Sequence, residues 1–247
     1  MSLLIRNKVN LLVCDMAGTI INEKGLIYKA IGSTLNKLGY PSTNEDIKTW
    51  HGADKREVMY RHIKSHYKSP NNKYILAKVN KAENLLITEL EQKYFEDNNI
   101  ELIDNKLLDF FHNLRTNNIK VALNTGYPKD FQRKIINHLN LTKSVDTWIS
   151  SEEVVAGRPA PYMIHQLMEQ CEIDSVSNVA KVGDTINDMK EGINAGCILN
   201  IGVLSGADNK EDLAKYTNLI INKITDLNDT PAADNISLRA LFKGLEI

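Results

Sequence analysis

Two short apolar runs lie far apart in the chain, and each is followed by an aspartate at or near the start of a turn. The first run covers residues 11–14 and is followed by Asp15, and the second covers residues 179–182 and is closely followed by Asp184 and then Asp188. Apolar runs this short are typical of buried strands, and the carboxyl ends of parallel strands meet at one edge of a sheet. The sequence therefore predicts that acids from two distant segments lie side by side at that edge.

Further apolar runs alternate with segments of helical spacing along most of the chain. The runs lie at residues 119–123, 147–149, 198–203 and 219–221. Between them, apolar residues recur three and four positions apart, as at Leu107, Phe110, Phe111 and Leu114 and at Phe131, Ile135, Ile136 and Leu139. This alternation predicts an α/β fold, in which helices cover both faces of a doubly wound parallel sheet.

One stretch, residues 23–98, interrupts the alternation with helical patterns and no convincing strand. It contains an apolar stripe over residues 27–38 and a long helical pattern over residues 75–94. Helical spacing of this kind buries one side of each helix against its neighbours. We therefore expect a helical lobe inserted into an α/β core that comprises residues 1–22 plus 99–229.

The balance of charge limits the classes of partner. The chain has 30 basic and 31 acidic residues and a formal net charge of -1, so no global field attracts nucleic acid or an anionic membrane. We therefore expect a small, locally recognised substrate.

The apolar stripe of the first lobe helix suggests a homodimer formed through the lobe. The C-terminal tail, residues 230–247, is expected to be a loosely held terminus, with a partner-binding helix as the alternative.

The cysteines and the apolar segments indicate the compartment. Cys14, Cys171 and Cys197 are odd in number, widely spaced and surrounded by apolar residues, which is typical of buried reduced thiols rather than disulfides or a zinc site. No apolar stretch approaches the ~20 residues that a membrane-spanning helix needs, and no signal-peptide pattern is seen at the start. We expect a cytoplasmic protein.

The aspartates suit phosphoryl-transfer chemistry. A carboxylate at the position of Asp15 can attack an electrophilic phosphorus in line if a divalent cation masks the repulsion between the two anions. Asp184 and Asp188 supply the hard oxygen ligands that Mg²⁺ prefers. The structural alternatives are helix caps and helix-surface acids. The presence of both motifs in one chain favours the chemical interpretation.

Two further segments offer groups that bind phosphate oxygens. Thr125, Gly126 and Tyr127 follow an apolar run and precede a helix, where a hydroxyl and free backbone N–H groups form a cradle for an anion. Arg158 lies in a Gly-Arg-Pro sequence beside the start of a helix, and its guanidinium could hold phosphate charge. An ordinary Thr-Gly turn and an exposed loop arginine are the respective alternatives.

These four segments, in this order and each at a strand end, resemble the haloacid dehalogenase superfamily of aspartate-nucleophile hydrolases. The resemblance covers about residues 9–221 and implies that the helical lobe is a type 1 cap. It also implies an aspartyl-phosphate formed at Asp15 and phosphoryl oxygens bound by Thr125, Gly126 and Arg158. The implied Mg²⁺ ligands are Asp15, the backbone carbonyl of Ala17, Asp184 and Asp188.

Ala17 makes the chain similar to one branch of this superfamily, the phosphonoacetaldehyde hydrolases or phosphonatases. Most phosphatases of the superfamily have an acid at this position that protonates the leaving oxygen, a contribution typically worth 10²–10⁴ in rate. The phosphonatase branch instead cleaves a carbon–phosphorus bond after a cap lysine has formed an imine with the substrate aldehyde. The matching lysine is Lys55, in the sequence Gly52-Ala53-Asp54-Lys55. A solvated lysine and a lysine that only binds an anion are the alternatives.

Three positions depart from the phosphonatase pattern. Val58 stands where the family has a proton-shuttling histidine, His51 where it has methionine and Met16 where it has tryptophan. A phosphonatase-like sister group shares the Asp-Met-Ala-Gly-Thr motif. We count Met16, His51 and Tyr127 as substrate-binding candidates. Cleavage of a carbon–phosphorus bond is the leading hypothesis, a small phosphate-ester hydrolase of the phosphoglycolate type is the second, and a catalytically weak binding protein is the third.

Overall fold

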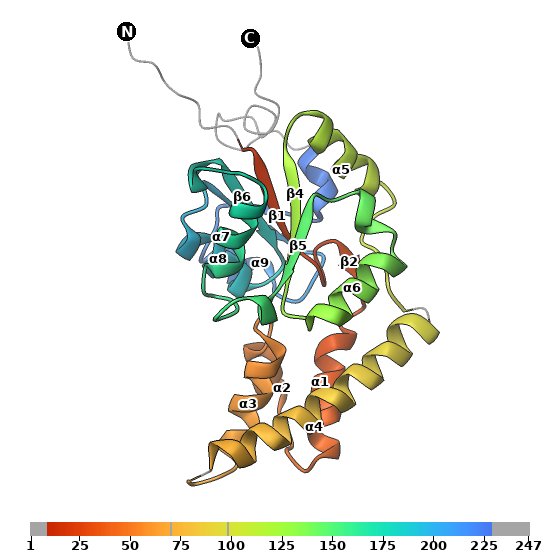
Figure 1. Ribbon diagram of the computed structural model, residues 1–247, viewed down its shortest axis with the longest axis vertical. Helices are drawn as coiled ribbons and strands as arrows, with labels where there is room; N and C mark the ends of the chain where they lie inside the picture. Colours follow the sequence, from red (N-terminus) through yellow and green to blue (C-terminus); the bar gives the residue numbers. More distant parts are fainter. Residues whose placement is uncertain (1–8, 70, 98, 229–247) are drawn as a thin grey trace.

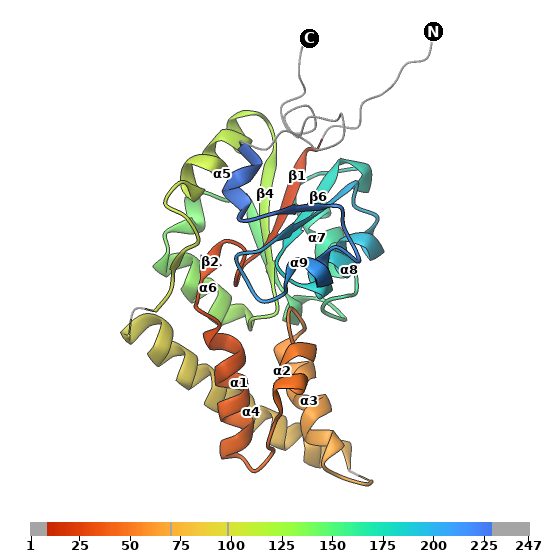
Figure 2. The same cartoon turned by 180° about the vertical axis from the view of Figure 1, so that it is seen from behind.

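The central element of the structure is a parallel sheet of six strands. In the computed structural model, which describes residues 9–69, 71–97 and 99–228, the strand order is β5-β4-β1-β6-β7-β8 (Figures 1 and 2). The strands are β1 Leu11–Asp15, β4 Lys120–Thr125, β5 Thr147–Ser150, β6 Val179–Gly183, β7 Leu199–Val203 and β8 Leu219–Ile221. The predicted fold class is confirmed. The predicted tail at residues 230–247 lies outside the described residues.

The two faces of the sheet are covered by different helices. Leu12 and Cys14 of β1 pack into the larger apolar core with α5 and α6, whereas Leu11 and Val13 pack with α7 in a second core. This alternation follows from the strand period of two, which sends successive side chains to opposite faces. The helices of the core domain are α5 Leu107–Thr116, α6 Lys129–His138, α7 Tyr162–Gln170, α8 Ile186–Ala195 and α9 Lys210–Leu213.

Strand β1 occupies the centre of the sheet and places Asp15 at a topological switch point. It pairs with β4 on one side, with Asp15 opposite Asn124, and with β6 on the other, with Cys14 opposite Val182. The chain order therefore reverses at β1, and open α/β sheets bind ligands in the crevice at such a reversal. The ends of β1, β4 and β6 meet at one point of the sheet edge.

Four helices and a π-helical turn form the cap beyond this edge of the sheet (Figures 1 and 2). They are α1 Leu26–Lys37, α2 Asn44–Thr49, α3 Lys55–Ser65, α4 Asn72–Glu91 and the π-helical turn Gln92–Glu96. Helices α1 and α3 pack on the long α4. The apolar stripe of α1, including Ile27, Ile31 and Leu35, is buried inside the cap. It does not form a free surface for pairing two copies, so the homodimer stays a prediction without support from this stripe.

A pair of very short strands lies where the chain enters and leaves the cap. Strand β2, Ile21–Asn22, pairs antiparallel with β3, Glu101–Leu102, and the Asn22 side-chain amide donates to the Glu101 carboxylate over 2.9 Å. The sequence analysis did not predict these strands because two residues are too few to show a period. Both connections to the cap are thereby joined at one place.

A buried chain of hydrogen bonds ties these connections to the sheet. The Tyr94 hydroxyl donates to the Glu23 carboxylate over 3.0 Å and lies 2.8 Å from the hydroxyl of Tyr127, which follows β4. Glu23 also accepts hydrogen bonds from the N–H groups of Gly25 and Ile27 at the start of α1. The start of α1, the π-helical turn that ends the cap and the residues after β4 therefore share one polar network, in which Glu23, Tyr94 and Tyr127 are buried.

The helices of the described residues include none with the length and apolarity that crossing a bilayer requires.

The three thiols provide a test of this packing. Burial raises the pKa of Cys171 to about 11 and that of Cys197 to about 12, and it also raises the pKa of the fully buried Cys14. At pH 8 a thiol of pKa 11 is only about one part in a thousand thiolate. We expect no rapid reaction with DTNB in the folded protein and three equivalents in guanidinium chloride. A rapid equivalent under native conditions would contradict the packing described.

Candidate active site

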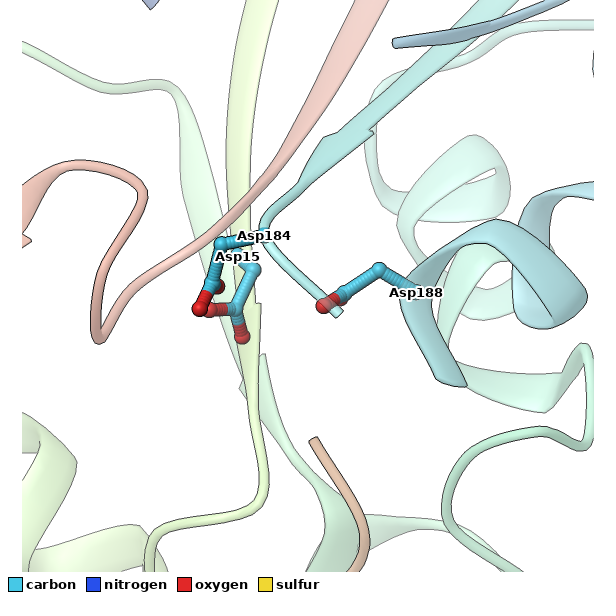
Figure 3. A group of neighbouring side chains, drawn as sticks. All are labelled: Asp15, Asp184 and Asp188. Atoms are coloured by element: carbon cyan, nitrogen blue, oxygen red, sulfur yellow. The ribbon is translucent and has the colours of Figure 1, made fainter. Parts of the chain in front are cut away.

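Three carboxylates converge at the end of the sheet (Figure 3). Asp15, Asp184 and Asp188 are 5%, 2% and 0% exposed, and each offers an oxygen that lies within 4.8 Å of the others. Asp15 ends β1, whereas Asp184 and Asp188 follow β6. The structure thus brings together the acids of both sequence motifs.

Local sequence explains how the acids come so close. Gly18 has a φ of +79°, and a Cβ atom there would lie 2.5 Å from Oδ2 of Asp184. Glycine is the residue that adopts this backbone conformation readily and leaves room for the carboxylate. Asp188 forms a capping box with Thr185 at the start of α8. Its Oδ2 accepts the Thr185 hydrogen bonds, so Oδ1 is left to face the site.

Asp184 is held by neutral donors. The Thr19 hydroxyl donates to its Oδ1 over 3.1 Å, and the backbone N–H of Ala207 donates to Oδ2 over 2.7 Å. It makes no ion pair with any residue in the described part of the chain. Burial, and then the charges of Asp15 and Asp188, raise its pKa well above the usual value. A cation would stabilise a charge on Asp184, and no residue in the described ranges pairs with it.

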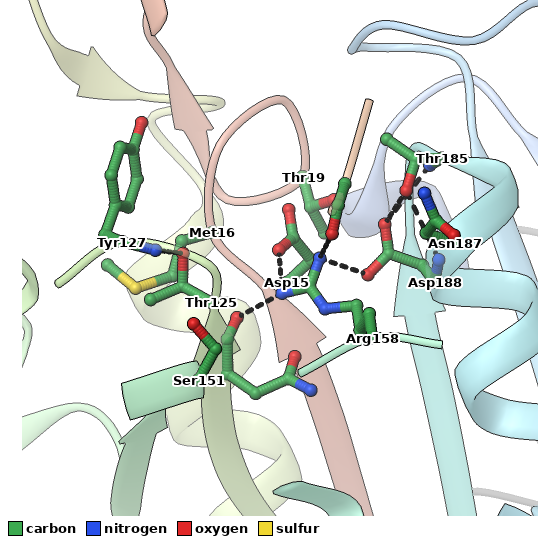
Figure 4. Close-up of polar contacts among 12 residues, drawn as sticks. Asp15, Met16, Thr19, Thr125, Tyr127, Ser151, Arg158, Thr185, Asn187 and Asp188 are labelled. Atoms are coloured by element: carbon green, nitrogen blue, oxygen red, sulfur yellow. Dashed lines mark hydrogen bonds and ion pairs between the residues drawn. The ribbon is translucent and has the colours of Figure 1, made fainter. Parts of the chain in front are cut away.

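Arg158 joins the other two acids (Figure 4). Its Nη2 lies 2.6 Å from Oδ1 of Asp15 and its Nη1 lies 2.9 Å from Oδ1 of Asp188. Nη1 also donates to the carbonyl oxygen of Gly52 in the cap over 3.3 Å. The side chain is 2% exposed, which excludes the interpretation of Arg158 as an exposed loop arginine.

A second cation lies behind Arg158 in a network that the sequence analysis missed. Lys181 of β6 lies 2.9 Å from Asp188 and 3.3 Å from Glu191, and it donates to the Asn124 side chain over 2.7 Å. Asn124 in turn donates to both oxygens of Glu191 over 2.9 Å. The one available signal was a lysine inside an apolar strand. Such a lysine is almost never fully buried unless it is paired.

Within this cluster negative charge exceeds positive charge. It contains the carboxylates of Asp15, Asp184, Asp188 and Glu191 but only two cations, Arg158 and Lys181. Burial would raise the pKa of Asp188, but Arg158 and Lys181 outweigh it and lower the pKa, whereas burial raises the pKa of Asp15. A divalent cation would balance the excess, and carboxylate oxygens are its preferred ligands. The donor set therefore fits a divalent metal at Asp15 and Asp184.

The cap reaches this cluster through the loop of residues 50–54, which we call the cap loop. The His51 ring nitrogen Nδ1 lies 2.7 Å from Asp208, and the Asn187 side chain donates to the His51 carbonyl oxygen over 2.6 Å. The Ser151 hydroxyl donates to Asp54, which caps α3. The cap loop is therefore docked on the core domain. Asp208 holds His51 at the cavity whose lining also includes Asp184.

Lys55 follows the cap loop as the first residue of α3 and is 7% exposed. This burial excludes the alternative of a solvated lysine at a helix start. Its Nζ donates to the Ala53 carbonyl oxygen over 3.0 Å and lies 5.1 Å from the ring centroid of Tyr28. Burial, followed by the charge of Arg158, lowers the pKa of Lys55 below its usual value of 10.5. The amine therefore carries a larger neutral fraction than a surface lysine.

The predicted phosphate cradle lies under the cap loop. A Cβ atom on Gly126 would lie 2.8 Å from the Ala53 carbonyl oxygen, so glycine permits the close approach of the loop. The Thr125 hydroxyl accepts a hydrogen bond from the Tyr127 N–H over 3.2 Å and is nearly buried. The side chains of Met16 and Tyr127 point away from the acids (Figure 4). Met16 sulfur accepts from Gln132 and Tyr127 contacts Tyr94, so these two can reach a substrate only through their backbone.

Two cavities flank the cap loop. The larger, of about 1020 Å³, is lined by Asp54, Arg158 and Asn187 among others. The smaller, of about 490 Å³, is lined by residues that include Tyr28 and Asp184. The docked cap loop thus lies between two openings that lead towards the acidic cluster.

Comparisons with known proteins agree with this geometry. The family model of haloacid dehalogenase-like hydrolases matches residues 9–196. The chain is 30% identical over 212 residues to the phosphonoacetaldehyde hydrolase of Latilactobacillus sakei, a match that covers 81% of this chain and 77% of that protein. It is 42% identical over 97 residues to the phosphonoacetaldehyde hydrolase of Parabacteroides distasonis. That match spans 38% of this chain and only 36% of the relative's length.

Solved structures show the same fold. A phosphonoacetaldehyde hydrolase-like protein from Oleispira antarctica superposes with a TM-score of 0.74 at 20% identity and covers 100% of this chain and 99% of its own. A β-phosphoglucomutase from Clostridium difficile gives 0.72 at 17% identity and covers 89% and 93%. Fold and site together are those of a capped α/β hydrolase. The chain belongs to the haloacid dehalogenase-like hydrolase family.

The buried cations are predicted to carry much of the stability of the site. Lys181→Met leaves Asp188 and Glu191 short of a partner, and breaking a buried pair typically costs about 3–5 kcal/mol. The matched control Lys37→Met removes an exposed ion pair with Glu89, worth at most about 1 kcal/mol. Urea unfolding should show this difference in the free energy of unfolding. Equal losses for both variants would contradict the role of Lys181.

Proposed function

We propose that this hydrolase uses Asp15 as a nucleophile and Mg²⁺ as its cofactor to cleave the carbon–phosphorus bond of a small phosphonate aldehyde of the phosphonoacetaldehyde type. One observation carries the proposal. The buried amine of Lys55, with its lowered pKa, is held on a cap loop that is docked beside the acidic cluster. The names of the two curated relatives support the same choice of substrate.

Asp15, Asp184 and Asp188 would hold or support the cation, with the Ala17 carbonyl as a further ligand. A bound Mg²⁺ offsets the repulsion between Asp15 and the anionic phosphoryl group. Arg158, which already contacts Asp15, is placed to bind a phosphoryl oxygen, and the N–H groups beside Thr125 and Gly126 offer further donors. In the proposed complex these groups would hold the phosphorus in line with the Asp15 carboxylate.

The proposed reaction begins at Lys55. Its neutral amine adds to the aldehyde carbonyl, and loss of water with uptake of one proton leaves an iminium. Asp15 then attacks phosphorus, the carbon–phosphorus bond breaks and its electron pair moves into the iminium to give an enamine. Protonation and hydrolysis of the enamine release the two-carbon aldehyde and the free Lys55 amine. Hydrolysis of the aspartyl-phosphate releases inorganic phosphate.

Ala17 fits this chemistry better than ester hydrolysis. A phosphate ester leaves as an alkoxide that a general acid normally protonates, and the Ala17 side chain has no proton to donate. An iminium carbon accepts the electron pair directly, so a carbon leaving group needs no such acid at this position. Ala17 therefore slows the hydrolysis of a phosphate ester but does not affect the cleavage of a carbon–phosphorus bond in this way.

The second candidate remains a phosphate-ester hydrolase that uses Lys55 to bind an anion. The observation that favours it is Val58, which is apolar and buried and cannot move the protons of imine formation. His51 is the histidine of the cap loop, but its Nδ1 already contacts Asp208. The third alternative, a binding protein, is not retained because the chain belongs to a hydrolase family.

The nucleophile can be tested by one isosteric change. Asp15→Asn removes the attacking charge but keeps the side-chain volume, so we expect turnover to fall to background with an unchanged circular dichroism spectrum. Phosphate release from phosphonoacetaldehyde and from a panel of simple phosphomonoesters provides the measurement. Residual turnover within a factor of ten of the wild type on any of these substrates would exclude Asp15 as the nucleophile.

The imine can be trapped. Borohydride added with phosphonoacetaldehyde should attach substrate mass to Lys55, and the adduct should be absent from Lys55→Met but present in Lys64→Met, which changes an exposed lysine of the same helix. Only the neutral amine reacts, so trapping should accelerate as pH rises and reach its half-maximum below pH 10.5 because the pKa of Lys55 is lowered. An absent adduct, with turnover of phosphomonoesters, would favour the second candidate.

A further inference from the structure

Tyr28 of α1 contacts the amine on which the proposed reaction depends. The Lys55 Nζ lies over the ring of Tyr28, 5.1 Å from its centroid. The two residues come from different helices, so the contact is tertiary rather than a neighbour effect within one helix. An ammonium within about 6 Å of a tyrosine ring face is attracted by the ring quadrupole. The ring therefore fixes the end of a side chain that is otherwise flexible.

The same tyrosine also holds the cap loop. The Gly52 N–H donates to the Tyr28 hydroxyl oxygen over 2.9 Å, and the Tyr28 and His51 rings lie 4.6 Å apart. Tyr28 thus contacts the two loop residues before Ala53, whose carbonyl oxygen accepts the hydrogen bond from Lys55. The position of the loop and the position of the amine are set by one side chain.

Gly52 of the cap loop also packs tightly against the core domain. Gly52 has a φ of +67°, and a Cβ atom there would collide with the Thr185 side chain. Its carbonyl oxygen accepts a hydrogen bond from Arg158. Gly52 is therefore held between Tyr28 in the cap and the acidic cluster in the core domain.

Tyr28 also borders a cavity beside the acidic cluster. Its side chain lines the cavity of about 490 Å³ that contains Ala17 and Asp184. Burial, followed by the charge of Asp184, raises the pKa of Tyr28 well above its usual value of 10, so the hydroxyl stays neutral and can accept from Gly52. The sequence analysis assigned no role to this position.

We propose that Tyr28 is a positioning residue for the Lys55 amine, with the ring holding Nζ and the hydroxyl holding the loop that carries it. The inference rests on the proposed function only for the reaction that the amine performs. The charged groups that act on Lys55 are Arg158, Asp15, Asp54 and Asp188. Two neutral groups contact the amine directly, the Tyr28 ring and the Ala53 carbonyl oxygen.

Three variants separate the ring from the hydroxyl. Tyr28→Phe keeps the ring and loses the Gly52 anchor, whereas Tyr28→Leu loses both. Tyr60→Leu is the control for loss of a tyrosine–lysine contact elsewhere in the cap, because the Lys64 Nζ lies 5.3 Å from the centroid of the Tyr60 ring within α3. If Tyr28→Leu does not fold, Tyr28→Met replaces it, since methionine fills a similar space without an aromatic face.

The first readout needs no substrate. Acetic anhydride labels neutral amines, and peptide mass spectrometry gives the rate at Lys55 as a function of pH. Loss of the ring removes a contact that favours the ammonium, so in Tyr28→Leu we expect the apparent pKa of Lys55 to fall by about half to one and a half units. Tyr28→Phe and Tyr60→Leu should match the wild type. An unchanged Lys55 profile in Tyr28→Leu would overturn the inference.

The second readout is turnover of phosphonoacetaldehyde. We expect Tyr28→Leu to lose at least tenfold in kcat, Tyr28→Phe to lose a few-fold, and Tyr60→Leu to be unaffected. Equal kcat in Tyr28→Leu and the wild type would also overturn the inference. A wild-type enzyme that forms no Lys55 adduct would instead refute the proposed reaction, while the labelling profile would still decide whether Tyr28 positions the amine.

Discussion

The structure depends on an excess of buried negative charge at the end of β1. Four carboxylates, from Asp15, Asp184, Asp188 and Glu191, share their surroundings with two cations. Removing a charge from water costs several kcal/mol unless it is paired, and here the pairing is incomplete. The doubly wound sheet imposes this arrangement, because it brings the ends of β1, β4 and β6 to one point. A site of this kind is preorganised for a divalent cation and for an anion bound next to it.

Arg158 connects this charge to the cap. Its guanidinium contacts Asp15 and Asp188 in the core domain and the carbonyl oxygen of Gly52 in the cap. The docked cap loop therefore gives a further partner to the cation that contacts Asp15, and Lys55, next to this loop, is buried. The hydrogen bonds of Glu23, Tyr94 and Tyr127 join the two connections of the cap to the end of β4.

The sequence predicted the parts of the site that depend on local pattern. Apolar runs that end in acids identified the strands and the positions of Asp15, Asp184 and Asp188, since the period and length of such runs reflect burial directly. Lys181 and Glu191 were given no role, because a lysine in an apolar strand and a glutamate in a helix of mixed composition show their partners only after folding. The paired strands β2 and β3 are too short for a period. Tyr28 was also missed, since its contacts come from a different helix and a loop.

The central claim is that Asp15 and Asp184 share one divalent cation. Manganese prefers the same oxygen ligands as magnesium and scatters anomalously, so crystals soaked in MnCl₂ test the claim directly. The account predicts one strong anomalous peak within about 2–2.5 Å of a carboxylate oxygen of both residues. A peak that contacts neither acid, or no peak at millimolar manganese in well-ordered crystals, would contradict it.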